Sequence, residues 1–258
     1  MNKAQIALTL GGIVLIVLLF QLPRAIVEND TLGSPVEETH TFTMSEEVTN
    51  QVRYFRSRWE SEENVEKKLN FADSLASLYL DYQVLDSGVW FVDYLKSTSS
   101  GGRERRIADL FYQAFQRTRD MESARELGER AGSEIKSLLD KDPSNSSLRN
   151  KLAMTLVVTE TPMEGIQMLR ELLEENPKDV ETIKNLGLLS IQSGQFAKAE
   201  ERFKSVLALD SLDLEAQFYF GMSQIEQGNN EGMKIMEELA QNDVNPAIRA
   251  LAIEYLEN

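Results

Sequence analysis

The sequence contains no cysteine and only one histidine, His40. Without cysteine the chain can form no disulfide, offer no thiolate ligand and use no thiol nucleophile. His40 lies in a polar stretch without helical or strand periodicity, where an imidazole cannot be fixed as a general base or a metal ligand. We therefore expect no enzymatic activity, no cofactor and no metal site.

Proline and glycine are also scarce, with 6 Pro and 14 Gly among 258 residues. Alternation of β-branched and polar residues is hard to find outside the N-terminus, whereas Leu, Glu, Ala and Lys are abundant. The pair Gly101-Gly102 lacks the Lys-Ser/Thr ending of a phosphate-binding loop, so we expect a connecting loop there. These scarcities favour an all-α protein.

Basic residues are outnumbered by acidic ones, 27 to 42, which gives a formal net charge of −15. A chain of this charge repels phosphate backbones, and the basic run at Arg103, Arg105 and Arg106 is too short to reverse that. We therefore expect no nucleic-acid partner.

One long hydrophobic run is present, from Ala4 to Leu22, with no charged residue in 19 positions. As a helix it would span roughly 28 Å, enough for the hydrocarbon core of a bilayer. A cleaved signal peptide would have a shorter run followed by a small-x-small site, which residues 21–27 do not offer. We expect an uncleaved single-pass anchor over residues 4–22, followed by a flexible tether over residues 23–43.

The orientation of this anchor rests on few charges. Lys3 and the terminal amine favour a cytoplasmic N-terminus, and Arg24 opposes them, but a large acidic domain translocates readily. We expect a bacterial inner-membrane protein with residues 44–258 in the periplasm.

A period of 34 residues runs through the C-terminal half. Pro143 and Pro177 are 34 residues apart, and so are Gly194 and Gly228. Between Val180 and Asp213, a larger apolar residue precedes Gly187, and the small residue Ala199 precedes the aromatic Phe203. The pattern describes two short helices that pack as a hairpin, with small residues where the helices cross closely.

This pattern resembles the tetratricopeptide repeat (TPR). The resemblance implies a right-handed superhelix of about five helix hairpins, because one hairpin cannot cover its own apolar face and must stack on the next. The expected units are about 69–102, 105–145, 146–179, 180–213 and 214–247, with a C-terminal cap over residues 246–258. The register places Gly187 at a contact between adjoining hairpins and Met233 at a small-residue position. A helix from Ser45 to about Glu60 either caps the first hairpin or offers an aromatic stripe to a partner.

In this family the first helix of each hairpin lines a concave groove. Carried over by position, the expected groove residues are Asn150, Met154, Val157, Lys184, Leu188, Ile191, Phe218, Met222 and Ile225. A groove with apolar residues at its centre suggests a helix or an extended segment of a partner protein. The architecture is similar to anchored periplasmic repeat proteins that assist envelope-protein assembly or translocation, so we expect a protein-binding scaffold. The alternative is a ligand- or glycan-binding module that uses aromatics of the first hairpin, namely Tyr79, Trp90, Phe91 and Tyr94.

Overall fold

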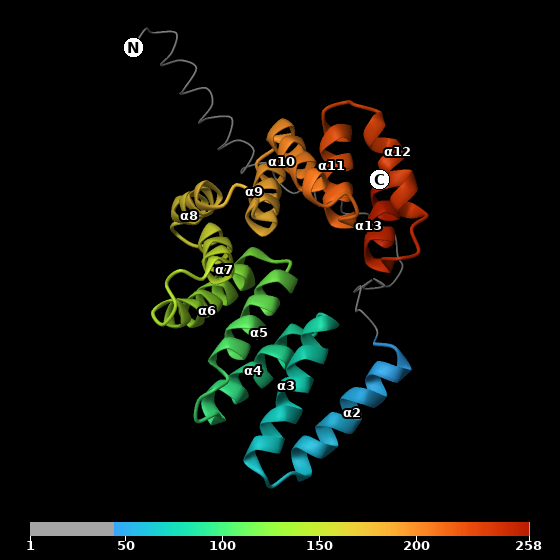
Figure 1. Ribbon diagram of the computed structural model, residues 1–258. Helices are drawn as coiled ribbons and strands as arrows, with labels where there is room; N and C mark the ends of the chain where they lie inside the picture. The colour runs from blue at the N-terminus through green and yellow to red at the C-terminus, as the bar shows by residue number, and fades with distance from the viewer. Residues whose placement is uncertain (1–43, 258) are drawn as a thin grey trace, which may run out of the picture. The chain divides into compact units, whose positions relative to one another are not determined.

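The structure is a computed structural model that describes residues 44–257 (Figure 1). All regular structure in this part of the chain is α-helical, which confirms the expected all-α class. The predicted anchor (4–22) and the predicted tether (23–43), which includes His40, lie outside the described residues. None of the helices between residues 44 and 257 is long and apolar enough to cross a membrane.

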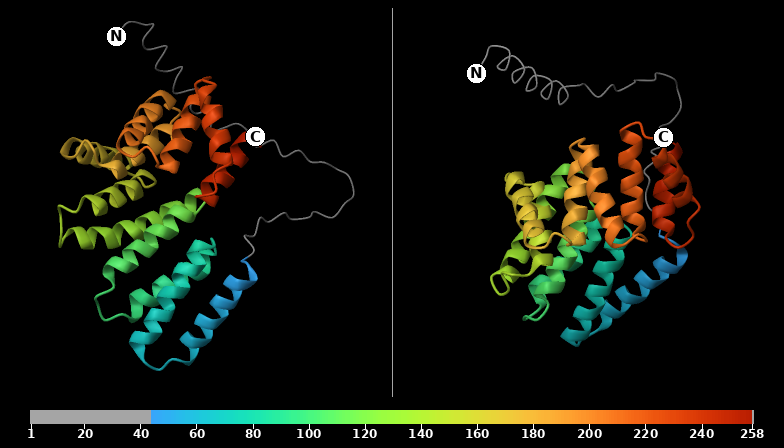
Figure 2. Two further views of the ribbon diagram at one scale, coloured as in Figure 1. Left: turned by 45° about the vertical axis from the view of Figure 1, so that its right-hand side comes forward. Right: turned by 45° about the horizontal axis from the view of Figure 1, so that its top comes forward.

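Twelve helices follow one another in this range. They are α2 (Glu46–Ser61), α3 (Val65–Asp81), α4 (Leu85–Thr98), α5 (Glu104–Arg117), α6 (Met121–Leu139), α7 (Ser146–Val157), α8 (Pro162–Glu175), α9 (Val180–Gln192), α10 (Phe196–Leu209), α11 (Leu214–Glu226), α12 (Glu231–Ala240) and α13 (Pro246–Glu257). Ten of them, α3 to α12, pair as five consecutive hairpins. Helix α2 packs on α3 at one end, and α13 packs on α12 and α11 at the other (Figures 1 and 2).

Hydrogen-bonding residues recur at the start of three hairpins. Asn145, Asp179 and Asp213 stand 34 residues apart, and each accepts a hydrogen bond from a backbone N–H in the first turn of the following helix. Such N-caps satisfy donors that the helix itself leaves free. The caps therefore set where α7, α9 and α11 begin.

A glycine lies in the turn that joins the two helices of the fourth and of the fifth hairpin. Gly194 and Gly228 adopt φ values of 69° and 79°, in the left-handed region that glycine enters without a Cβ clash. In each turn the next residue donates its N–H to a carbonyl of the preceding helix, Gln195 to Ser190 (2.8 Å) and Asn229 to Gln224 (2.9 Å). This arrangement ends α9 and α11 and returns the chain for the second helix of each pair.

The close crossings between helices show that two details of the predicted repeat register were wrong. A Cβ on Gly187 would lie 2.7 Å from the ring of Phe203 in α10, so the close contact is within one hairpin and not between adjoining ones. In the fifth hairpin the small residue is Gly232 instead of Met233: a Cβ there would lie 2.3 Å from the Gly221 carbonyl oxygen. Because α12 is displaced by one residue relative to the 34-residue period, Met233 is 38% exposed.

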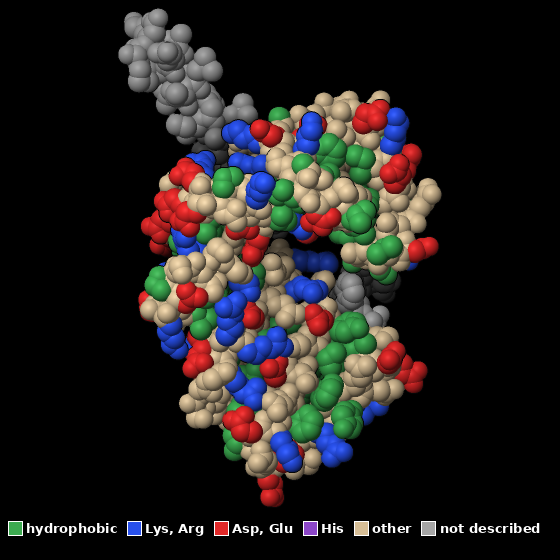
Figure 3. Space-filling view, viewed as in Figure 1, with side chains coloured by type: hydrophobic (Ala, Val, Ile, Leu, Met, Phe, Trp, Pro, Cys, Tyr) green, Lys and Arg blue, Asp and Glu red, His purple; other side chains and the backbone are tan. Residues whose placement is uncertain are grey.

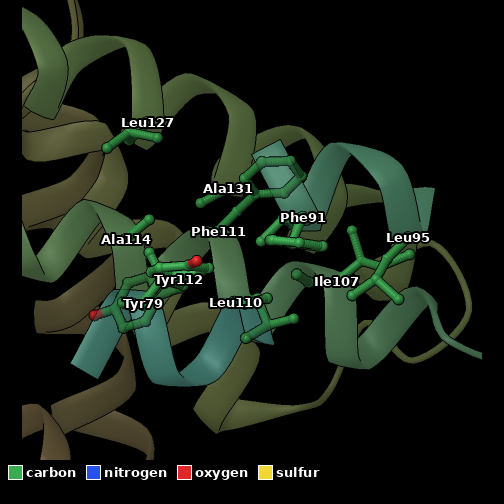
Figure 4. Close-up of a cluster of buried hydrophobic side chains, with 14 of the residues drawn as sticks. Tyr79, Phe91, Leu95, Ile107, Leu110, Phe111, Tyr112, Ala114, Leu127 and Ala131 are labelled. Atoms are coloured by element: carbon green, nitrogen blue, oxygen red, sulfur yellow. The ribbon is translucent and has the colours of Figure 1, made fainter. Parts of the chain in front are cut away.

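The apolar core is largest in the first two hairpins. Phe91 from α4, Leu110 and Phe111 from α5, and Ala131 from α6 are almost fully buried and pack together there (Figure 4). Smaller clusters continue through the later hairpins, around Leu169, Phe203 and Met236. The core is thus a series of local clusters, as expected when each hairpin buries its apolar face against its neighbours.

Candidate functional site

The first helices of the hairpins lie along the inner side of the array. The backbone of each of α3, α5, α7 and α9 lies close to the backbone of the next first helix, whereas the backbones of the described second helices α4, α6, α8, α10 and α12 lie farther apart. The array therefore curves toward α3, α5, α7, α9 and α11, which we call the inner face (Figure 2). Among the second helices, α4 and α6 are joined by side-chain ion pairs, Lys96–Glu134 and Arg130–Asp93.

Ion pairs join successive helices of this inner face. Arg106 on α5 reaches Asp73 on α3 (2.6 Å), and Lys151 on α7 reaches Asp109 on α5 (2.5 Å). Lys184 on α9 pairs with Asp213 (3.1 Å), the N-cap of α11, and with Glu215 on α11. Lys and Arg side chains are interspersed with Asp and Glu around the hollow in the middle of Figure 3. We call this series of contacts the inner ladder.

Between α7 and α9 the inner ladder consists of side-chain hydrogen bonds instead of an ion pair. The Asn150 side chain is fully buried, and its Nδ2 donates to Thr182 Oγ1 (2.9 Å). The Thr182 hydroxyl in turn donates to Asp179 (2.9 Å), so the N-cap of α9 belongs to the same network. A buried amide with these partners holds two helices together. Asn150 is thus a structural residue, and the prediction that it faces a partner has to be corrected.

Three other predicted groove residues also differ from expectation. Phe218 is only 6% exposed and packs in the core with α13, because the last helix covers it. Lys184 is occupied by its two carboxylates in the inner ladder. Val157 lines a pocket with Ile166 and Arg170 of α8.

The remaining five predicted groove residues are partly buried against local core clusters. Met154 packs near Leu169, Leu188 and Ile191 pack near Phe203, and Met222 and Ile225 pack near Met236. The structure therefore brings the nine residues onto neighbouring helices but does not arrange them as one apolar stripe. Charged pairs interrupt the row.

An apolar groove lies instead at the C-terminal end, between α11, α12 and α13. It has a volume of about 610 Å³, and its lining residues are Phe218, Ile225, Glu226, Met233, Leu251, Glu254, Tyr255 and Leu256. Met233 and Leu251 are 38% and 42% exposed, well above a core residue. We call this feature the C-terminal groove.

Tyr255 fixes one wall of the C-terminal groove. Its hydroxyl donates to Glu226 Oε1 (2.9 Å), which ties α13 to the end of α11. Burial, together with this hydrogen bond to a carboxylate, raises the pKa of Tyr255 to about 12. The ring also meets Phe218 edge to face, with centroids 6.1 Å apart, so the wall is held from both ends.

The sequence pointed to only part of this groove. Phe218 and Ile225 were expected at a partner surface, but residues 246–258 were expected only to cover the end of the stack. The signal for the rest was the spacing of Leu251 and Tyr255, which stand four residues apart on one helix face.

Aromatic residues of the first hairpin mainly serve packing. Phe91 and Tyr79 are buried, and Trp59 of α2 meets Trp90, Phe91 and Tyr94 edge to face at 5.3–5.7 Å between centroids. Of these rings only Trp90 is largely exposed, at 52%. Because glycan binding needs a row of exposed ring faces, the first hairpin does not favour the alternative function. Phe55 and Trp59 of α2 pack against the core of the hairpin, whereas Tyr54 is 53% exposed.

Among residues 44–257, no group of three or more His, Cys, Asp or Glu could hold a metal ion. That the chain is not an enzyme and holds no cofactor or metal stays a prediction.

Comparison with known proteins gave matches among solved structures only. No protein-family model matches the sequence, and no curated protein matches it. One matching structure is YrrB, a TPR protein with an unusual peptide-binding site; it is 19% identical, covers 80% of this chain and 100% of its own, and has a TM-score of 0.42. Another is Acl4, the assembly chaperone of RpL4, at 15% identity, 81% and 91% coverage, and a TM-score of 0.49.

A third matching structure is the C-terminal part of a TPR-containing protein from Cytophaga hutchinsonii, at 12% identity, 76% and 74% coverage, and a TM-score of 0.42. The matching structures thus include TPR proteins. At these identities and scores they carry no argument about the site, which rests on the geometry described above.

Proposed function

We propose that this protein is a membrane-anchored scaffold that holds another protein outside the cytoplasm, and that its C-terminal groove receives an apolar segment of that partner. The observation that carries the proposal is the groove itself. Met233 and Leu251 are exposed beside a floor that includes Phe218. Apolar surface gathered in a groove between helices is typical of a site that accepts an amphipathic helix or an extended segment.

The rim of the C-terminal groove suits a partner with some positive charge. Glu226 and Glu254 border the apolar lining, and the chain as a whole carries −15. A segment with apolar residues at helical spacing and Lys or Arg beside them would bury its apolar side chains and place its cations near these carboxylates. Charges at the rim would mainly speed association, while the apolar centre would supply most of the affinity.

The location is supported by the sequence alone. The uncharged run from Ala4 to Leu22 has the length of a transmembrane helix, and the acidic domain after it favours translocation. Such an anchor would hold the groove near the membrane surface, where envelope proteins are assembled or translocated. A role in that process is part of the proposal.

The proposal is tested by changing the two exposed groove residues together. Met233→Glu with Leu251→Glu should leave helicity and melting nearly unchanged, because both side chains already contact water. The same change should abolish recovery of the partner by crosslinking and affinity capture from detergent-solubilised membranes, since central apolar contacts contribute about 2 kcal/mol or more each.

A matched control is available on other helices. Met121→Glu with Met163→Glu adds the same charge at side chains that are 70% and 63% exposed and lie outside the C-terminal groove. This variant should capture the same protein as the wild type. Equal capture by the groove variant would show that the partner binds elsewhere, and an unfolded groove variant would show that the two residues belong to the core.

A further inference from the structure

A second pocket lies where the first helices α7 and α9 meet the second helices α8 and α10. Its volume is about 280 Å³. Its apolar lining includes Val157, Ile166 and Leu189, and its polar lining includes three cationic side chains, Arg170, Lys198 and Arg202. No Asp or Glu is found among the residues that line it. We call this feature the outer pocket.

The three cations of the outer pocket lack the carboxylate partners that other cations of this chain have. Between residues 44 and 257, none of them takes part in an ion pair, whereas Arg106, Arg149 and Lys184 each do. Three unpaired cations in one pocket contrast with the overall excess of acidic residues, 42 against 27. The pocket is therefore a local positive site on an acidic protein.

Arg202 is held in place before any ligand arrives. Its Nη1 donates to the Leu186 carbonyl oxygen (2.7 Å) and to Ser190 Oγ, so the guanidinium is fixed against α9. Burial, and then the positive charge of Arg170, lowers the pKa of Arg202, and the carboxylate of Glu201 offsets this only in part. An anion in the pocket would oppose both effects, because it would add counter-charge beside a partly desolvated cation.

Helix α10 adds to the positive field. It begins at the outer pocket with Gln195 as N-cap, and the Gln195 side chain makes no capping hydrogen bond. Backbone N–H groups at such an end carry partial positive charge and favour a nearby anion. This contribution only supplements the three side chains.

We infer that the outer pocket binds a carboxylate side chain of a partner protein, flanked in the partner's sequence by an apolar residue. The three cations would hold the carboxylate, and Val157, Ile166 and Leu189 would contact the apolar neighbour. A free inorganic anion would leave that apolar lining uncovered. A nucleic acid or an anionic bilayer would bring many charges against a chain of −15, whereas a single acidic side chain needs only the local site. This inference goes beyond the proposed function and does not depend on the C-terminal groove.

The test uses the full chain in detergent and a short fluorescent peptide in which Glu alternates with Leu. Binding is followed by fluorescence anisotropy. A peptide with Gln in place of Glu should bind at least about tenfold more weakly, since its amides cannot neutralise the cations. Arg170→Gln with Lys198→Gln should weaken binding of the Glu peptide by at least about tenfold. Both side chains are exposed, so melting should not change.

The control changes the net charge equally at other exposed sites. Lys178→Gln with Lys204→Gln lies outside the outer pocket and should leave binding as in the wild type. If both double variants weakened binding of the Glu peptide equally, the loss would follow from net charge alone, and the inference would be overturned. Equal binding of the Glu and Gln peptides would also overturn it. So would displacement of the Glu peptide by inorganic phosphate at equal concentration, because the site would then recognise a small anion only.

Discussion

Gln83 occupies a backbone conformation that glycine adopts elsewhere in this chain. Its φ of 57° lies in the left-handed region, and it stands in the turn between α3 and α4 where the later hairpins have Gly194 and Gly228. The hydrogen bonds match as well: Val84 donates to the Tyr79 carbonyl (2.8 Å), as Gln195 does to Ser190. The first hairpin therefore makes the same turn with a residue whose Cβ is unfavourable there.

Replacing Gln83 by glycine should stabilise the protein. Relief of the left-handed strain outweighs the greater freedom of glycine in the unfolded chain, so we expect Gln83→Gly to raise the free energy of unfolding by about 0.5–1 kcal/mol. Gly194→Gln, the reverse change in an equivalent turn, should lower it by about 1 kcal/mol. Chemical denaturation of both variants measures the two effects. A loss of stability in Gln83→Gly would mean that the Gln83 side chain makes contacts that outweigh the strain.

At the scale of single residues, the position of a residue within the repeat did not determine how exposed its side chain is. Asn150 and Met154 were both expected to face a partner, because both stand on the inner side of α7. Asn150 is buried since Thr182 of the next hairpin offers its hydroxyl at hydrogen-bond distance. Phe218 is buried since α13 covers it. Which neighbour covers an inner residue depends on side chains about one repeat away, and the residue's own unit holds no signal for that.

Single helices were more predictable than their contacts. The all-α class followed from the scarcity of glycine and proline and from apolar residues at helical spacing. Asn145, Asp179 and Asp213 precede α7, α9 and α11, and local capping of this kind is readable in a sequence. The displacement of α12 by one residue could not be predicted in this way, because the pair Asn229-Asn230 before the helix fits either register.

At the scale of single elements, the attachment of helix α13 depends on pH. The pKa of Tyr255 is raised from 10.0 to about 12, so the folded protein favours the protonated phenol. The unfolded chain gives up this proton first as the pH rises. The stabilising contribution is thus complete below pH 10.0 and is lost between pH 10.0 and about 12.

We therefore expect the melting temperature to fall across this window, and to fall less steeply in Tyr255→Phe. The difference in phenolate absorbance between the wild type and Tyr255→Phe reports the titration of Tyr255 directly. If the titration of Tyr255 measured in this way had its midpoint near pH 10.0, the contact between Tyr255 of α13 and Glu226 of α11 would not raise the pKa as described.

For the molecule as a whole, the proposed membrane anchor makes the most general prediction. If Ala4 to Leu22 is an uncleaved transmembrane helix, the protein should remain in the membrane fraction after high-salt and carbonate washing. N-terminal sequencing should then begin at Met1 or Asn2. Release into the soluble fraction, with a sequence that begins between Ala25 and Asp30, would instead identify a cleaved signal peptide.

The inner ladder has a consequence for how far the array can bend. Successive inner helices are joined by ion pairs such as Arg106–Asp73, and the outer helices α4 and α6 are joined by Lys96–Glu134 and Arg130–Asp93. Dissolved salt weakens such pairs without entering the apolar clusters inside the hairpins. We therefore expect the curvature of the array to change with ionic strength while each hairpin stays folded. Small-angle X-ray scattering at low and high salt, together with circular dichroism, would measure both.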